Sequence, residues 1–189
     1  MKTKTLLLAI IAILFIGGTK TYAQSQENKM LIVYFSWSSN GNTRNVAKQI
    51  ETLTTGADIF EIVPEQAYPS DYKECVDQAK IEINDNFKPE IKGKVTDFDV
   101  YDIIFVGSPN WWNTIAPPVA TFFANYDFSD KTIIPFITHG SSGLGRSVDD
   151  MKKLCPDATI LSSLLIKASE MGEAGSEIQQ WLKDLKVIK

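Results

Sequence analysis

The order of apolar and polar positions divides the chain into alternating strand-like and helix-like segments. Apolar runs predict strands at 30–35, 58–63, 102–107, 132–138 and 159–166. Apolar residues at helical spacing predict helices within 43–53, 69–83, 117–123, 147–154 and 178–185. This alternation predicts an α/β fold, with a doubly wound five-stranded parallel sheet in a three-layer α/β/α sandwich. Ser147 and Asp150 match a capping-box pattern, so we expect Ser147 to cap the helix at 147–154.

A run of small hydroxyl and amide residues follows the first predicted strand and opens onto a helix. It comprises Ser36, Trp37, Ser38, Ser39, Asn40, Gly41, Asn42 and Thr43. The first N–H groups and the dipole of a helix attract anions. The run holds no Lys or Arg, so backbone N–H groups and hydroxyls would bind the anion, and Gly41 permits close approach. We interpret it as a phosphate cradle; the alternative is an ordinary turn with Thr43 as the helix N-cap.

Two further loops follow the third and fourth predicted strands, at the same edge of the sheet. The first contains Ser108, Pro109, Asn110, Trp111 and Trp112, and no charged residue occurs from 107 to 126. Two adjacent tryptophans in a loop predict one ring packed inward and one facing a planar ligand. The second loop contains Thr138, His139, Gly140 and Gly143. His139 is the one catalytic candidate, although a lone His is more often a structural hydrogen-bonding residue.

A phosphate cradle, an aromatic loop and a Gly/Ser loop together indicate a ligand with a phosphate tail and a flat polar ring. Flavin mononucleotide (FMN) meets all three requirements. One His and two isolated cysteines cannot build a zinc site, and we expect no metal. Cys75 and Cys155 lie on segments that the predicted fold separates, so we expect free thiols rather than a disulfide.

The chain resembles the flavodoxin family, and especially its short bacterial flavodoxin-like members. The matching segments are 32–36, 41–43 leading into 46–47, 101–102, 107–112, and 138–140 with 143–145, in a resemblance that covers essentially the whole chain after Met30. It implies noncovalent FMN, with the phosphate in the first loop and the ring between the second and third loops. Trp111 matches the position where such proteins often stack an aromatic on the ring.

The chain departs from the family pattern in two loops. The first loop is about two residues longer than the usual Ser/Thr-x-Thr-Gly-x-Thr pattern, so Ser38, Ser39 and Asn40 compete for the phosphate. The third loop has Gly143 near the place where many electron carriers stack an outer aromatic. We therefore expect one face of the flavin to be open, to a substrate or to a neighbouring subunit in a homodimer.

The flavin loops contain no carboxylate, which favours two-electron reduction of a small quinone-like acceptor. The alternatives are a one-electron carrier that docks on a basic redox partner protein, and an exported flavodoxin-fold binding protein without turnover. No dinucleotide fingerprint identifies an electron donor.

The N-terminus has the pattern of a signal peptide. A basic start, an apolar run over 6–16 and Ala23 predict cleavage after residue 23, a linker at 24–29 and a domain at 30–189. We therefore expect an exported, periplasmic protein; the alternative is an uncleaved membrane anchor. Cleavage removes Lys2, Lys4 and Lys20 and no acidic residue, which changes the formal charge from −4 to −7. This acidic balance disfavours nucleic acid and anionic membranes as partners.

Overall fold

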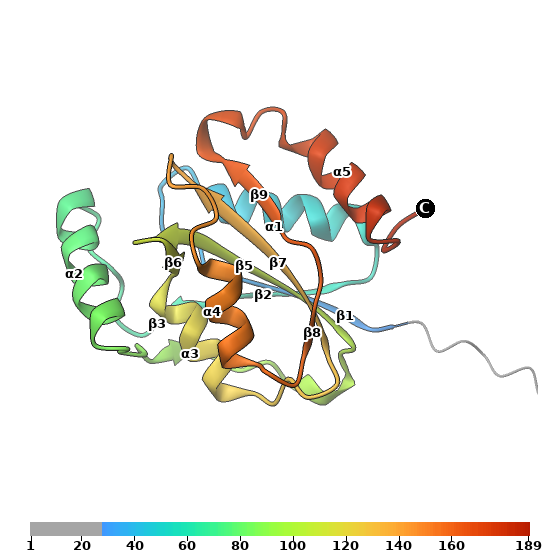
Figure 1. The fold of residues 1–189 in the computed structure, drawn as a ribbon, viewed down its shortest axis with the longest axis horizontal. Helices are drawn as coiled ribbons and strands as arrows, with labels where there is room; N and C mark the ends of the chain where they lie inside the picture. Colours follow the sequence, from blue (N-terminus) through green and yellow to red (C-terminus); the bar gives the residue numbers. More distant parts are fainter. Residues whose placement is uncertain (1–27) are drawn as a thin grey trace, which may run out of the picture.

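The computed structural model describes residues 28–189, so the predicted signal peptide lies outside the described residues. The sheet contains β1 (Met30–Tyr34), β2 (Asp58–Glu61), β5 (Ile103–Trp111), β7 (Thr132–His139), β8 (Thr159–Ile160) and β9 (Leu164–Lys167). The strands are parallel in the order β2-β1-β5-β7-β8, and β9 also pairs with β7 (Figure 1). This order confirms the doubly wound parallel sheet. The predicted fifth strand is split into β8 and β9, and the Ser162 carbonyl between them accepts a hydrogen bond from Trp181 Nε1 at 3.0 Å.

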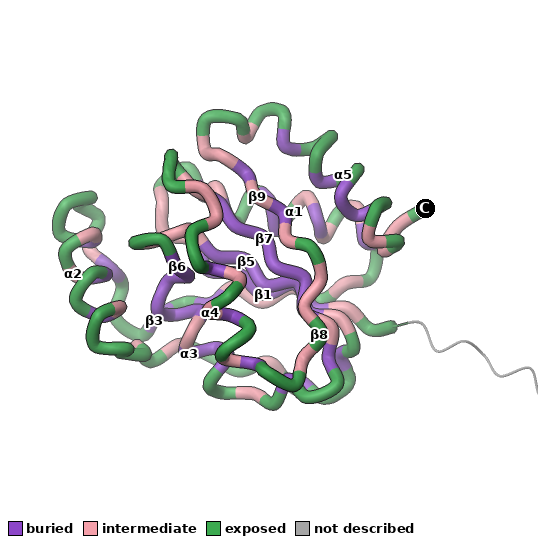
Figure 2. The backbone as a smooth tube through the Cα atoms, viewed as in Figure 1, coloured by how far each residue is buried: buried purple, intermediate pink, exposed green. Residues whose placement is uncertain are grey.

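Four helices cover the two faces of the sheet. α1 (Asn42–Leu53) and α5 (Ala174–Asp184) share one buried cluster, and α3 (Pro117–Asn125) and α4 (Ser147–Leu154) belong to the other. Alternation along β1 decides the face: Ile32 packs in the α1/α5 cluster, and Leu31 and Val33 pack in the α3/α4 cluster. Figure 2 shows the strands buried between these layers, as the predicted three-layer sandwich requires.

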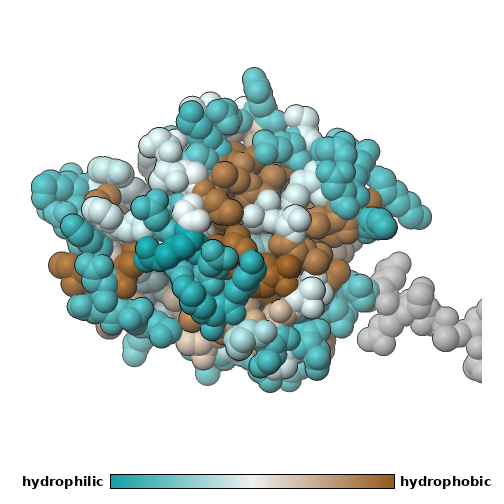
Figure 3. Space-filling view, in the orientation of Figure 1, coloured by the Kyte–Doolittle hydropathy of each residue, from teal (hydrophilic) through white to brown (hydrophobic). Residues whose placement is uncertain are grey.

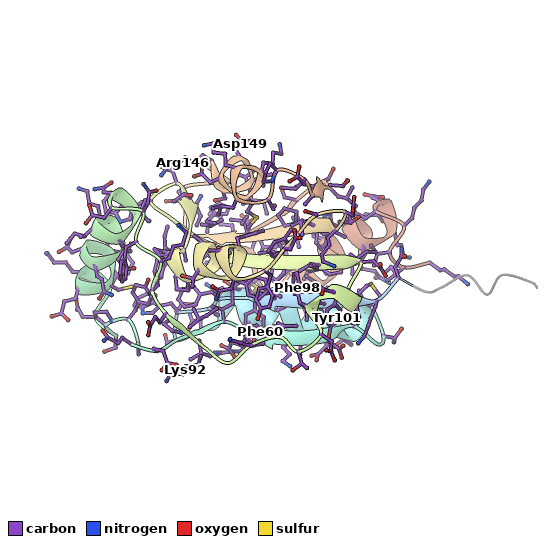
Figure 4. All side chains as sticks on the ribbon, turned by 90° about the horizontal axis from the view of Figure 1, so that it is seen from below. Phe60, Lys92, Phe98, Tyr101, Arg146 and Asp149 are labelled. Carbon is purple, nitrogen blue, oxygen red and sulfur yellow. The ribbon has the colours of Figure 1, made fainter. Side chains whose placement is uncertain are left out.

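The segment between β2 and β5 leaves the sheet. It contains β3 (Val63–Pro64), α2 (Tyr72–Asn84), β4 (Ile91–Lys92), which pairs antiparallel with β3, and the 3-10 turn η1 (Phe98–Val100). In Figure 4, Phe60, Phe98 and Tyr101 lie on the side of the molecule away from Asp149 of α4 and from Arg146, which precedes that helix. α2 stands beside the sheet, at the end where the strands finish, and does not cover a face (Figure 1). Asp71 caps it by accepting a hydrogen bond from the Glu74 N–H at 2.9 Å.

Two local predictions are wrong. The third strand does not end at 107 but runs to Trp111 and forms a hairpin with β6 (Thr114–Ile115), so Trp111 lies in a strand rather than a loop. Ser147 does not cap α4, since the helix begins at that residue and Arg146 occupies the cap position. The Asp150 carboxylate, which a capping box would direct to the backbone, accepts hydrogen bonds from Thr114 and Arg146 instead.

The surface differs between the sheet edge and the helices. Figure 3 shows hydrophobic surface between α4 and α5, near the sheet edge that β8 and β9 form.

A further 3-10 turn, η2 (Ala168–Glu170), connects β9 to α5. No helix among residues 28–189 combines the length and the apolar character needed to cross a membrane.

Candidate functional site

A cavity of about 520 Å³ lies where β1, β5 and β7 end. β1 is the first strand of the sheet in sequence, and the chain crosses from it to β2 on one side and β5 on the other, which makes this edge the switch point of the fold. The cavity volume is within the range of small-molecule sites. None of the described residues that line it is Asp, Glu, Lys or Arg.

The loop after β1 turns into α1 through Gly41, whose φ of +61° is in the left-handed region that favours glycine. The Gly41 N–H donates to the Ser38 carbonyl at 2.8 Å, which closes the turn. Thr43 is not the N-cap, because Gly41 occupies that position; the Thr43 hydroxyl is buried and lies 2.8 Å from the hydroxyl of Thr138. The first and third predicted loops therefore meet directly at the cavity.

Two buried polar atoms near the cavity lack a hydrogen-bond partner within the described part of the chain. They are the hydroxyl oxygen of Ser36 and the amide oxygen Oδ1 of Asn110. The orientation of the Asn110 amide is set by its Nδ2, which donates to the Gly143 carbonyl at 2.6 Å. An unsatisfied buried polar group costs about 1–3 kcal/mol, so both atoms are suited to a bound polar ligand.

The β5–β6 hairpin turns through Trp112 and Asn113, whose φ angles are 50° and 63°. Such a pair forms the tight two-residue turn that matches strand twist, but a Trp in the left-handed region is strained. The turn is held on one side by the Arg146 N–H, which donates to the Asn113 carbonyl at 2.8 Å, and by Gly145. A Cβ on Gly145 would lie 2.5 Å from that carbonyl oxygen, so only glycine fits there.

A polar network ties this hairpin to α4. The Thr114 hydroxyl donates to Asp150 Oδ2 at 2.6 Å, and Arg146 Nε and Lys153 Nζ each bond to the same carboxylate at 2.7 Å. Burial alone would raise the pKa of Asp150, but these hydrogen bonds outweigh it and hold the pKa below its usual value. The hairpin at the cavity is thus fixed to α4.

The aromatic residues form a connected wall. Trp111 makes edge-to-face contacts with the rings of Tyr68 and Phe35, with centroids 5.0 and 5.4 Å away, and with Trp37 at 6.1 Å. Trp111 and Trp112 both line the cavity, and Trp112 is 43% exposed. Trp111 also packs against other rings, but both tryptophans line the cavity. The structure therefore does not assign one ring to the interior and the other to the ligand.

His139 lines the cavity with a defined tautomer. Its Nδ1 accepts a hydrogen bond from the Gly143 N–H at 3.0 Å. In the neutral ring the proton is therefore on Nε2, which becomes a hydrogen-bond donor. The residue can donate to a carbonyl or ring nitrogen of a bound molecule.

The sequence model of flavodoxins matches residues 29–185. The chain belongs to the flavodoxin family. No curated protein sequence matches it at a significant level.

Solved structures support this assignment. A candidate flavoprotein from Bacteroides eggerthii shares 30% identity, covers 85% of this chain and 99% of its own, and superposes with a TM-score of 0.71. A flavoprotein from Lactobacillus acidophilus, solved in complex with FMN, shares 25% identity over 79% of this chain and 99% of its own, with a TM-score of 0.63. The flavodoxin fold of this chain is therefore similar to that of flavoproteins over nearly their whole length.

The flavodoxin fold brings most of the predicted site residues to one cavity. The predicted residues that line it are Trp37, Ser38, Asn42, Thr43, Pro109, Asn110, Trp111, Trp112, Thr138, His139 and Gly140. Six others do not line it: Ser36, Ser39, Asn40, Gly41, Ser108 and Gly143. Ser108 has a structural role instead, because its hydroxyl accepts from the Ala116 N–H at 2.9 Å and donates to the Pro109 carbonyl.

Sequence reasoning missed one side of this flavodoxin's cavity. Tyr72, Cys75, Val76 and Ala79 of α2 line it, as do Asn113, Ser141, Ser142 and Ala168. Ser141 and Ser142 belong to the predicted Gly/Ser loop and could have been included. Nothing in the helical pattern of 72–84 indicates that α2 leaves the sheet, so its contribution depends on the tertiary fold.

Proposed function

We propose that this flavodoxin-family protein binds FMN noncovalently in the 520 Å³ cavity and uses it to reduce a small quinone-like acceptor by two electrons. FMN is the cofactor that the family assignment and the FMN complex of the Lactobacillus acidophilus flavoprotein support.

The residues present fit FMN. The N-terminal turn of α1 offers backbone N–H groups to a phosphate, and Ser38, Asn42 and Thr43 line the cavity beside it. The unpartnered Ser36 hydroxyl lies in the same loop and can donate to an anion. The positive charge of Arg44 is not directed to the phosphate site, because its guanidinium forms an ion pair with Glu61. Asn110 Oδ1 can accept a hydrogen bond from a ring N–H, and His139 Nε2 can donate one.

Bound FMN would supply the redox chemistry, and the protein tunes it through charge and hydrogen bonds. The absence of charged side chains among the described lining residues carries the two-electron proposal. Reduction adds electrons to the ring, and a neighbouring carboxylate would oppose the second of them by charge repulsion. Without such a carboxylate, and with a donor at His139, the second reduction is not penalised.

Titration of the purified protein with FMN tests the cofactor site. We expect Ser36→Ala to weaken FMN binding by about 10-fold or more, because a hydrogen bond to a charged group is worth about 1.5–3 kcal/mol. Ser39→Ala is the matched control, since Ser39 is an exposed serine of the same loop, whereas the Ser36 hydroxyl is buried and has no partner. A wild type that binds no FMN contradicts the proposal.

An anaerobic redox titration of the FMN-loaded protein tests the electron count. We expect a single two-electron transition, followed by reoxidation with one equivalent of quinone. Two well-separated one-electron transitions would instead support a one-electron carrier. The acidic composition of the chain, with a formal charge of −4, is the observation that favours this second candidate, because it suits docking on a basic partner.

A further inference from the structure

The cavity has two chemically different sides. The side built by α1 and the strand ends carries hydroxyl, amide and imidazole groups, including Thr43, Thr138 and His139. The opposite side is α2, which presents Tyr72, Cys75, Val76 and Ala79. Apart from the Tyr72 hydroxyl, these side chains offer no strong hydrogen-bonding group to a phosphate, a ribityl chain or the polar edge of a ring. Burial and the charge of Glu82 raise the pKa of the Cys75 thiol to about 11, so this thiol is uncharged near neutral pH.

Trp112 holds α2 against the cavity. Its Nε1 donates to the Val76 carbonyl at 3.0 Å, and Lys80 Nζ lies 4.8 Å from the centre of its ring. The Trp112 backbone adopts the strained φ of 50° that the turn requires. Tryptophan is unusual at a hairpin turn position with positive φ, and 43% of the surface of Trp112 is exposed. Its contacts with α2 explain why a tryptophan occupies this position.

Further contacts anchor both ends of α2. Trp37 Nε1 donates to the Pro69 carbonyl at 2.9 Å, and the Tyr68 hydroxyl donates to the buried carboxylate of Glu82. Both aromatic rings also contact Trp111. The helix is therefore positioned by the same aromatic wall that lines the cavity, so the shape of the apolar side is defined.

We infer that Val76 and Ala79 of α2, together with Trp112, form a binding subsite for a flat, uncharged aromatic acceptor of the quinone class, and that this subsite selects acceptors by size. The subsite deepens the proposed function and rests on it. Apolar side chains beside an aromatic ring bind a flat apolar molecule by area burial and stacking. None of the described lining residues is a cation that could hold an anionic acceptor; Lys80, which contacts the Trp112 ring, does not line the cavity.

The reaction balances with the acceptor alone. The reduced cofactor loses two electrons and two protons in total, and returns to the oxidised form. The quinone gains them: its two carbonyl oxygens become hydroxyls, and the product is a hydroquinone.

Equilibrium binding to the oxidised, FMN-loaded protein tests the subsite without turnover. Isothermal titration calorimetry with 1,4-naphthoquinone gives its affinity, and a separate FMN titration gives the affinity for the cofactor. Val76→Phe should weaken naphthoquinone binding about 10-fold by filling the subsite, and change FMN affinity less than about twofold. Val76→Ala, which keeps the helix and only removes apolar contact, should weaken naphthoquinone about threefold or more. Ile81→Phe on the exposed side of α2 is the matched control and should change neither.

The rates of reoxidation by two quinones of different size provide a second test of the subsite. After stoichiometric reduction with dithionite, Val76→Phe should slow reoxidation by 1,4-naphthoquinone more than by the smaller p-benzoquinone. Ile81→Phe should slow neither.

The outcomes separate the subsite from the proposed function. A wild type without FMN binding overturns the proposed function, and the subsite with it. An FMN-loaded wild type that does not bind naphthoquinone overturns the subsite alone. If Val76→Phe weakens FMN as much as naphthoquinone, α2 contacts the cofactor itself and the subsite is wrong. Equal naphthoquinone affinity in all variants would also overturn it.

Discussion

The polar side of the cavity belongs to the sheet, whereas the apolar side belongs to a helix that stands beside the sheet. On the polar side, Thr43 and Thr138 come from elements that pack against strands, and they bond to each other in a buried position. On the apolar side, α2 is held by long side chains, chiefly Trp112 and Trp37, that bond to its backbone or to the residues before it. One side lies on the sheet itself, and the other is joined to the core by these bonds and by the buried Cys75.

The two sides of the cavity therefore suit two different tasks, phosphate binding and acceptor binding. Groups that bind a charged phosphate must be held rigidly, because misplaced dipoles lose their stabilising effect. A wall that binds an uncharged acceptor acts through its apolar area and shape, so its supports can lie outside the sheet. We therefore expect changes on the sheet side to cost stability, and changes on the α2 side to cost selectivity or local order.

The largest expected effect is Gly107→Ala on the sheet side. A Cβ at Gly107 would lie 2.2 Å from the ring of Phe136 in the neighbouring strand, and both residues are in the centre of the sheet. Such overpacking costs about 1–3 kcal/mol, which urea unfolding measures. Gly140→Ala is the control, because no atom lies within 4 Å of its added Cβ. Equal stabilities of the two variants would show that the centre of the sheet accommodates the added methyl group easily, which contradicts a rigid sheet side.

Thr43→Val tests the bond between the first and third loops. Valine keeps the shape and removes the hydroxyl that lies 2.8 Å from that of Thr138. We expect the free energy of unfolding to fall by about 1–2 kcal/mol, because the Thr138 hydroxyl is left buried, and FMN binding to weaken. Thr52→Val in the same helix is exposed and is the control. A cost no larger for Thr43→Val than for Thr52→Val would contradict a rigid polar side.

Asp150→Asn tests how firmly the hairpin is tied to α4. The folded-state pKa of Asp150 is lowered, so its ionised form contributes stability above the unfolded pKa and loses it as pH falls through the lowered value. At pH 7 we expect the variant to be less stable by about 1 kcal/mol, and the gap to close between about pH 5 and pH 2. Asp149→Asn, whose carboxylate is exposed, is the control. A gap that is constant with pH would point to packing rather than charge.

Trp112→Phe should have the smallest effect on global stability. It removes the Nε1 hydrogen bond to Val76, which contributes about 0.5–1.5 kcal/mol, and weakens the contact with Lys80. Hydrogen exchange should show faster exchange of α2 amides with little change in β5. Lys80→Met removes the cation alone and should give a smaller increase. A loss of stability as large as that of Gly107→Ala would show that α2 belongs to the folding core.

Much of this arrangement follows from local patterns. The continuous apolar runs predict β1, β5 and β7, because strands buried on both faces need apolar residues throughout. The three loops are predicted at one edge, because parallel strands all end on the same side. The boundaries are less predictable: Trp111 continues β5 because β6 supplies it with a pairing partner, and only the folded hairpin reveals that partner.

The sequence by itself determined the doubly wound sheet, the polar loop before α1 and the tryptophans after the third strand. These features depend on residue spacing and on the chemistry of neighbouring residues. Only the tertiary structure decided that α2 forms the second side of the cavity. An amphipathic helix carries one apolar face, and its pattern does not show whether a sheet, an aromatic wall or a cavity lies against that face. The hydrogen bond from Trp112 to Val76 joins residues 36 positions apart in the sequence. No local pattern can therefore predict that α2 lines the cavity.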